Sequence, residues 1–118
     1  MLRILDKTFA VLLALGAVGH TLGSFKAFHD QPAVLLWALC ASVLIVFIGA
    51  INLLRASRRG DRPLAGIAAF GALSWLVASL AFGMIIENVL DFRVLVFALL
   101  SAGLFVFSLR DALSKPNA

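Results

Sequence analysis

The chain has 118 residues, of which 63% are hydrophobic and 14% are charged, and its formal net charge is +4. Too few polar residues are present to cover a water-soluble domain, so the composition excludes an ordinary globular protein. The basic excess does not indicate nucleic-acid binding, because Lys and Arg gather near the ends of apolar runs rather than along one face. We therefore expect an integral membrane protein that contacts membrane lipids and binds no nucleic acid.

Four apolar runs are predicted to cross the membrane as helices. Each has about 18 to 24 residues, which is long enough for a helix to span about 30 Å of hydrocarbon. They cover residues 8–25, 32–54, 63–86 and 89–109. The connections are short and leave no room for a separate soluble domain. We expect one all-α transmembrane domain over residues 1–118, arranged as a four-helix bundle.

The first run, residues 8–25, follows a short basic start. It has the outline of a signal peptide, but we interpret it as a retained helix. The run carries Gly16, Gly19 and Gly23, and the last two have the small-xxx-small spacing that lets a second helix backbone approach closely. We expect these glycines to pack helices together. His20 lies between them and is the one ionisable residue that we expect between the helix ends.

The second run, residues 32–54, begins with Asp30 as the expected N-cap and Pro32 in the first turn, which together are a helix start signal. An arginine-rich loop follows, with Arg55, Arg58, Arg59 and Arg62. If all four runs cross the membrane, eight of the ten Lys and Arg residues fall on the side of this loop and of both termini. The positive-inside rule then predicts that this side is cytoplasmic.

Asn52 lies within one turn of Arg55, near the expected level of the inner lipid headgroups. Together with the loop arginines it is a candidate ligand-binding residue, with phosphate as the ligand. The alternative, which we favour, is that the arginines orient the protein and bind anionic lipid loosely.

The third run, residues 63–86, starts with Asp61 as the expected N-cap and carries small and polar residues at every fourth position. These residues form one stripe, which we expect to face protein rather than lipid. Its members are Gly71, Trp75, Ser79, Gly83 and Glu87. We expect Gly71 and Gly83 to pack helices together. Trp75 lies near mid-membrane, where its indole N–H needs an acceptor such as Ser79 or a backbone carbonyl.

The fourth run, residues 89–109, is rich in Leu, Val and Phe, which is typical of a lipid-exposed helix. Asn88 is the expected N-cap, with Asp91 as its capping-box partner.

Residues that could carry chemistry are few. The chain has no nucleophile beside a base, no cysteine cluster and no carboxylate expected in mid-membrane, so proton-coupled export is disfavoured. The polar residues of the predicted outer side do not have the spacing of a metal site; they are His29, Asp30, Glu87, Asn88 and Asp91. A haem would need a second axial ligand besides His20. We expect no enzyme activity, no cofactor and no metal, and His20 most simply as a hydrogen-bonded packing residue.

The stretch from Gly16 to Phe28, GAVGHTLGSFKAF, resembles the end of the first helix in DoxX-like bacterial membrane proteins. In that family, glycines and a polar or basic residue precede an aromatic loop on the outer side, and chain length and four-helix layout are also similar. The resemblance implies a small protein of the bacterial inner membrane with an accessory role beside redox or stress systems. It assigns no catalytic residue to this chain.

Two functional hypotheses follow. The first is a non-enzymatic accessory or scaffold protein that forms a homo-oligomer or packs on another membrane protein. The second is a binder or carrier of a lipid or hydrophobic small molecule, held between the first and third helices near His20, Trp75 and Ser79.

Overall fold

The computed structural model describes residues 1–116 and consists of four helices. They are α1 (Leu2–Phe28), α2 (Pro32–Ser57), α3 (Arg62–Ile85) and α4 (Phe92–Leu113). No strand is present in the described part of the chain. All four helices are long and apolar enough to cross a membrane, so the predicted all-α class with four candidate spans is confirmed.

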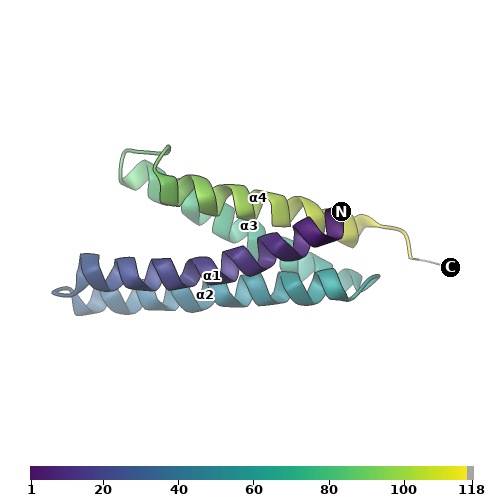
Figure 1. Cartoon of the computed structure of the whole chain (residues 1–118), viewed down its shortest axis with the longest axis horizontal. Coiled ribbons are helices and arrows are strands. Elements are labelled where there is room, and N and C mark those ends of the chain that lie inside the picture. The colour runs from purple at the N-terminus through teal and green to yellow at the C-terminus, as the bar shows by residue number, and fades with distance from the viewer. Residues whose placement is uncertain (117–118) are drawn as a thin grey trace.

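The four helices form two antiparallel hairpins, α1 with α2 and α3 with α4 (Figure 1). The bundle is elongated, with dimensions of 57 × 24 × 21 Å. The hairpins meet at the end that carries the N-terminus, the α2–α3 loop and the end of α4, which we call the arginine end. They diverge toward the opposite end, which carries the α1–α2 and α3–α4 connections and which we call the loop end (Figure 1).

Three helices extend further at the arginine end than their apolar runs predict. α1 begins at Leu2 rather than at residue 8, α2 continues to Ser57 rather than ending at residue 54, and α4 continues to Leu113 rather than ending at residue 109. The length of an apolar run matches the thickness of the hydrocarbon layer and does not mark where the helix ends. Backbone hydrogen bonding continues beyond the run, because Arg, Lys and Ala are good helix formers.

Of the two aspartates expected to cap helix starts, Asp61 and Asp30, only Asp61 does so. Asp61 caps α3, and its carboxylate accepts a hydrogen bond from the Leu64 N–H at 3.1 Å, as predicted. Pro32 occupies the first turn of α2, but the N-cap is Gln31 and no side chain caps this helix.

The fourth helix begins at Phe92 rather than at residue 89, and its N-cap is Asp91 rather than Asn88. The reason lies in the end of α3. Glu87 adopts a left-handed conformation with φ of 55°, and the Asn88 N–H donates to the Gly83 carbonyl at 2.9 Å. This is the hydrogen-bond pattern of a Schellman motif, so Asn88 closes α3. A turn in which the Asp91 N–H donates to the Asn88 carbonyl at 3.2 Å then precedes α4.

Glycines bring the helices close together at several crossings. A Cβ added at Gly49 of α2 would lie 2.8 Å from the Ala10 carbonyl oxygen of α1, and one at Gly16 would lie 2.7 Å from the Phe97 ring of α4. Gly71 faces Ile48, Gly83 faces Val89 and Val94, and Gly103 faces Phe9. Neither Gly49 nor Gly103 was among the glycines predicted to pack helices together. Small residues at such crossings allow close backbone approach.

Gly19 and Gly23 differ from these packing glycines. Both are exposed, and a Cβ added at either would meet nothing within 4 Å. They lie three and seven residues after Gly16, hence on a similar face of α1, but toward the loop end, where the hairpins have separated. The packing within one chain therefore does not require either glycine.

Candidate functional site

A buried arginine joins three helices at the arginine end. Arg55 of α2 is 2% exposed, and its Nη1 and Nη2 donate to the two carboxylate oxygens of Asp6 in α1 at 2.5 and 2.6 Å. Nη1 also donates to Oδ2 of Asp111 in α4 at 2.9 Å. Bidentate pairing of this kind is among the stronger charge-assisted hydrogen bonds in proteins.

Asn52 extends this network to the remaining helix, α3. The residue is fully buried, and its Nδ2 donates to the Ile48 carbonyl at 3.0 Å and to the Ala68 carbonyl of α3 at 3.4 Å. Its Oδ1 accepts from the Ser108 hydroxyl at 2.7 Å and from Arg55 Nη2 at 3.3 Å. The amide that was predicted to bind a ligand is thus engaged within the bundle.

This network corrects two expectations. His20 is not the one ionisable residue between the helix ends, because Asp6 and Arg55 lie inside α1 and α2 and are buried. Arg55 is also not a residue of a solvated loop. Part of this was accessible in the sequence: Asn52 and Arg55 are three residues apart on one helix face, and a buried arginine requires a carboxylate partner. Which carboxylate supplies it depends on how the helices pack.

A second polar cluster lies further toward the loop end. His20 Nδ1 and the Ser42 hydroxyl of α2 are 2.7 Å apart and share a hydrogen bond. The His20 ring meets the Trp75 ring of α3 edge to face, with centroids 6.2 Å apart, and Trp75 meets Phe97 at 5.6 Å in the same manner. Side chains therefore bridge α1 and α3 here, although their backbones do not approach within 8 Å between Cα atoms.

The Trp75 indole lacks the acceptor that was expected for it. Trp75 is 8% exposed, and its Nε1 is buried with no hydrogen-bond partner in the described chain. Ser79 is not that acceptor: its hydroxyl donates to the Trp75 carbonyl at 2.8 Å, and Trp75 Nε1 makes no hydrogen bond to it. Asn52 does not join this cluster either, since it lies ten residues beyond Ser42, about 15 Å along α2.

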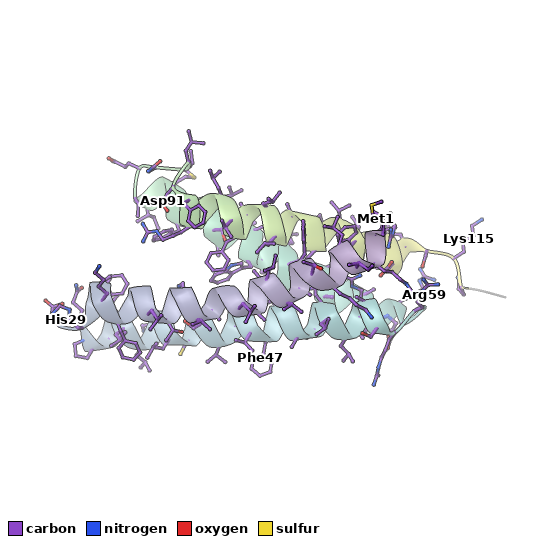
Figure 2. All side chains as sticks on the ribbon, viewed as in Figure 1. Met1, His29, Phe47, Arg59, Asp91 and Lys115 are labelled. Carbon is purple, nitrogen blue, oxygen red and sulfur yellow. The ribbon has the colours of Figure 1, made fainter. Side chains whose placement is uncertain are left out.

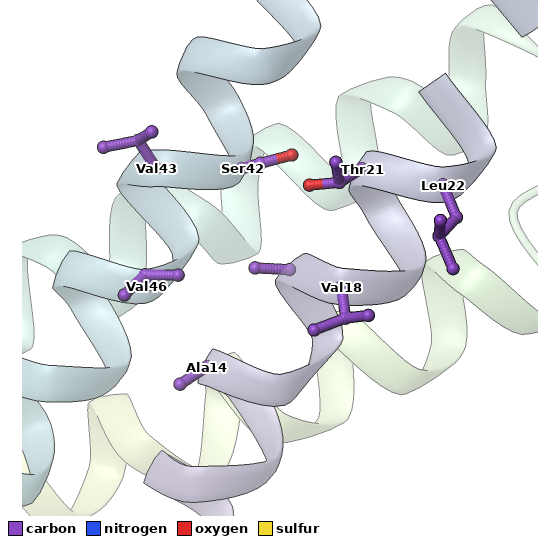
Figure 3. Close-up of a pocket in the computed structure, with 8 residues that line it drawn as sticks. Ala14, Val18, Thr21, Leu22, Ser42, Val43 and Val46 are labelled. Atoms are coloured by element: carbon purple, nitrogen blue, oxygen red, sulfur yellow. The ribbon is translucent and has the colours of Figure 1, made fainter. Parts of the chain in front are cut away.

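An apolar groove of 350 Å³ runs between α1 and α2 (Figure 3). His20 does not line it but shares a hydrogen bond with Ser42, which does. Val18, Leu22, Val43 and Val46 are four of its eight lining residues, and the Ser42 and Thr21 side chains point toward each other across it. Its chemistry suits a hydrocarbon chain. A ligand was predicted between the first and third helices, whereas this groove belongs to the first hairpin alone.

The polar residues at the loop end lie on separate hairpins. Figure 2 shows His29 at the tip of the first hairpin and Asp91 at the tip of the second, where the hairpins are apart. Among residues 1–116, no group of three or more His, Cys, Asp or Glu side chains is placed to hold a metal ion.

Comparison of the chain with protein-family models, curated proteins and solved structures gives no match.

Proposed function

We propose that the protein is a small non-enzymatic membrane scaffold that self-associates through the loop-end half of α1. The glycine pair Gly19 and Gly23 carries this proposal, because both are exposed and unused by the chain's own packing. Gly16 and Gly49, by contrast, lie against neighbouring helices. A small-xxx-small pair without an internal partner favours contact with another helix.

A second copy of the chain is the occupant that we propose for this face. Two α1 helices that cross at Gly19 and Gly23 present the same surface to each other, which is the requirement of a two-fold interface. Another membrane protein on this face is the alternative outcome of the test below.

We further propose that the arginine end is cytoplasmic and that the protein resides in the bacterial inner membrane as a DoxX-like relative. The positive-inside rule supports the orientation, since both termini and the arginine-rich loop share one end of the bundle (Figure 1). The Gly16–Phe28 stretch, described above, supports the family.

Leucine at Gly19 or Gly23 should abolish self-association while the chain stays folded. The added side chain blocks backbone approach between copies, but it meets no atom within its own chain near the Cβ position. Counting of photobleaching steps in lipid vesicles should give two copies per particle for the unmodified chain and one for either variant.

Gly66→Leu is the matched control, because Gly66 of α3 is likewise exposed and open to an added Cβ. It should keep two copies per particle. Equal loss of association in Gly66→Leu, or unchanged association in Gly23→Leu, contradicts the proposed interface. If each particle instead holds one copy of the unmodified chain and a different membrane protein, that protein, and not a second copy, occupies the glycine face.

A second candidate function, binding of a lipid or hydrophobic molecule, rests on the unpartnered indole of Trp75. A buried N–H without an acceptor costs free energy, which a ligand carbonyl or hydroxyl next to His20 would recover. Trp75→Phe keeps an aromatic ring but removes this donor.

We expect Trp75→Phe and His20→Ala to lose a co-purified molecule that the unmodified chain retains in native mass spectrometry, without a change in oligomeric state. If no such mass accompanies the unmodified chain, or if both variants retain it, the binder function is excluded for this cluster.

A further inference from the structure

A cavity of 620 Å³ opens beside the buried Arg55 network at the arginine end. Three stretches that are distant in sequence line it: the start of α1, the end of α2 with its loop, and the end of α4. The cavity is lined by five basic side chains, which are Arg3, Arg55, Arg59, Arg110 and Lys115. Its size lies within the range of small-ligand sites, about 300 to 1,000 Å³.

The two carboxylates that line the cavity are already engaged. Both oxygens of Asp6 accept from Arg55, at 2.5 and 2.6 Å. Asp111 accepts from Arg55 at 2.9 Å through Oδ2 and from Arg110 at 3.3 Å through Oδ1. Within residues 1–116, by contrast, Arg3, Arg59 and Lys115 form no ion pair. The cavity therefore carries an excess of positive charge.

Membrane orientation alone does not account for this arrangement. The positive-inside rule requires basic residues at this end but does not require them to share a cavity. Arg58, next to Arg59 in the same loop, does not line it, and the guanidinium of Arg62 is used on the Ala112 carbonyl at 2.9 Å. Arg55 also lines the cavity, and its buried Nε has no hydrogen-bond partner in the described chain.

We propose that this cavity binds one phosphate group. Guanidinium groups match phosphate oxygens in geometry and charge, and Arg3, Arg59 and Arg110 supply them from three different stretches. The phosphate belongs either to an anionic lipid headgroup or to a small soluble phosphate. This proposal does not depend on self-association through Gly19 and Gly23, because the cavity lies at the start of α1 and the two glycines lie near its end.

Arg59→Gln tests the site, with Arg58→Gln as a control that removes the same charge from the same loop outside the cavity. The probes are dioctanoyl phosphatidic acid, dioctanoyl phosphatidylcholine and inorganic phosphate, titrated by calorimetry into the full chain in a neutral detergent. We expect one phosphatidic acid per chain and no binding of phosphatidylcholine. Arg59→Gln should weaken binding about tenfold or more, because it removes a charge-assisted hydrogen bond to the phosphate. Arg58→Gln should bind as the unmodified chain does.

The outcomes separate the two sources of phosphate. If inorganic phosphate competes for the site with the same dependence on Arg59, and the lipid does not bind, the ligand is a soluble phosphate. Equal weakening by Arg58→Gln and Arg59→Gln overturns the proposal, because it shows diffuse attraction by the basic surface. Failure of both phosphatidic acid and inorganic phosphate to bind overturns it as well.

Discussion

Asp6→Ala should destabilise the folded chain by about 3 to 5 kcal/mol. The substitution leaves the Arg55 guanidinium without its main partner, and the side chain of Arg55 is 1% exposed. A buried charge that loses its bidentate partner costs more than the pair contributed, because the remaining partner, Asp111, accepts only one hydrogen bond from Arg55. Unfolding by sodium dodecyl sulfate in mixed micelles, followed by circular dichroism, measures the change in the free energy of unfolding.

Two variants show whether the buried pair is responsible. Asp111→Asn should cost clearly less, because the Asp111 side chain is 34% exposed and Arg55 keeps Asp6. The double substitution Asp6→Leu with Arg55→Leu should recover most of the stability lost in Asp6→Ala, since it removes both charges. If Asp6→Ala and Asp111→Asn cost the same small amount, Arg55 is not held by a buried ion pair.

Gly49→Leu should separate α1 from α2. A Cβ at Gly49 would lie 2.8 Å from the Ala10 carbonyl oxygen and 3.0 Å from the Ala14 backbone nitrogen, and these backbone atoms cannot move aside as a side chain can. Overpacking by one methyl group costs about 1 to 3 kcal/mol, and we expect Gly49→Leu to exceed the cost of Gly49→Ala. The same unfolding assay measures both variants.

Gly66→Ala and Gly19→Ala are the matched controls, since an added Cβ at either position meets no atom within 4 Å. Both should be as stable as the unmodified chain or more stable, because Ala favours a helix over Gly by about 0.5 to 1 kcal/mol. A Gly49→Ala variant with the stability of these controls would show that the hairpin does not cross closely at Gly49.

The four-helix fold was predictable because hydrophobic length is a direct signal of a membrane span. The apolar runs located all four helices, and Asp61 marked the start of the third. Helix ends were less predictable at the arginine end, where Arg3, Asp6 and Lys7 continue α1 through polar sequence. The N-cap of α4 was missed because a local backbone feature, the left-handed Glu87, commits Asn88 to the preceding helix.

The candidate sites could be predicted only where the residues that form them lie on one helix. Spacing along the third run indicated the Gly71 and Gly83 contacts. In the first run the spacing indicated Gly19 and Gly23, which meet nothing within 4 Å in their own chain. Asp6 and Arg55 meet within the first hairpin although they are 49 residues apart, and Asp111 joins them from the second hairpin. Their meeting depends on how the helices pack, which the hydrophobic pattern does not encode. The same holds for the basic cavity, whose lining comes from both termini and the central loop.

Cysteine cross-linking at Gly23 tests the proposed scaffold most directly. Cys40 is exposed and must first be replaced by serine, after which Gly23→Cys supplies one thiol per chain. Two α1 helices in contact at this glycine bring the two sulfurs within disulfide distance. Oxidation in native membranes should give a covalent dimer at twice the protomer mass of 12.6 kDa, whereas Gly66→Cys in the same background should remain a monomer. A monomer from Gly23→Cys, or equal dimer from both variants, would contradict self-association through this face.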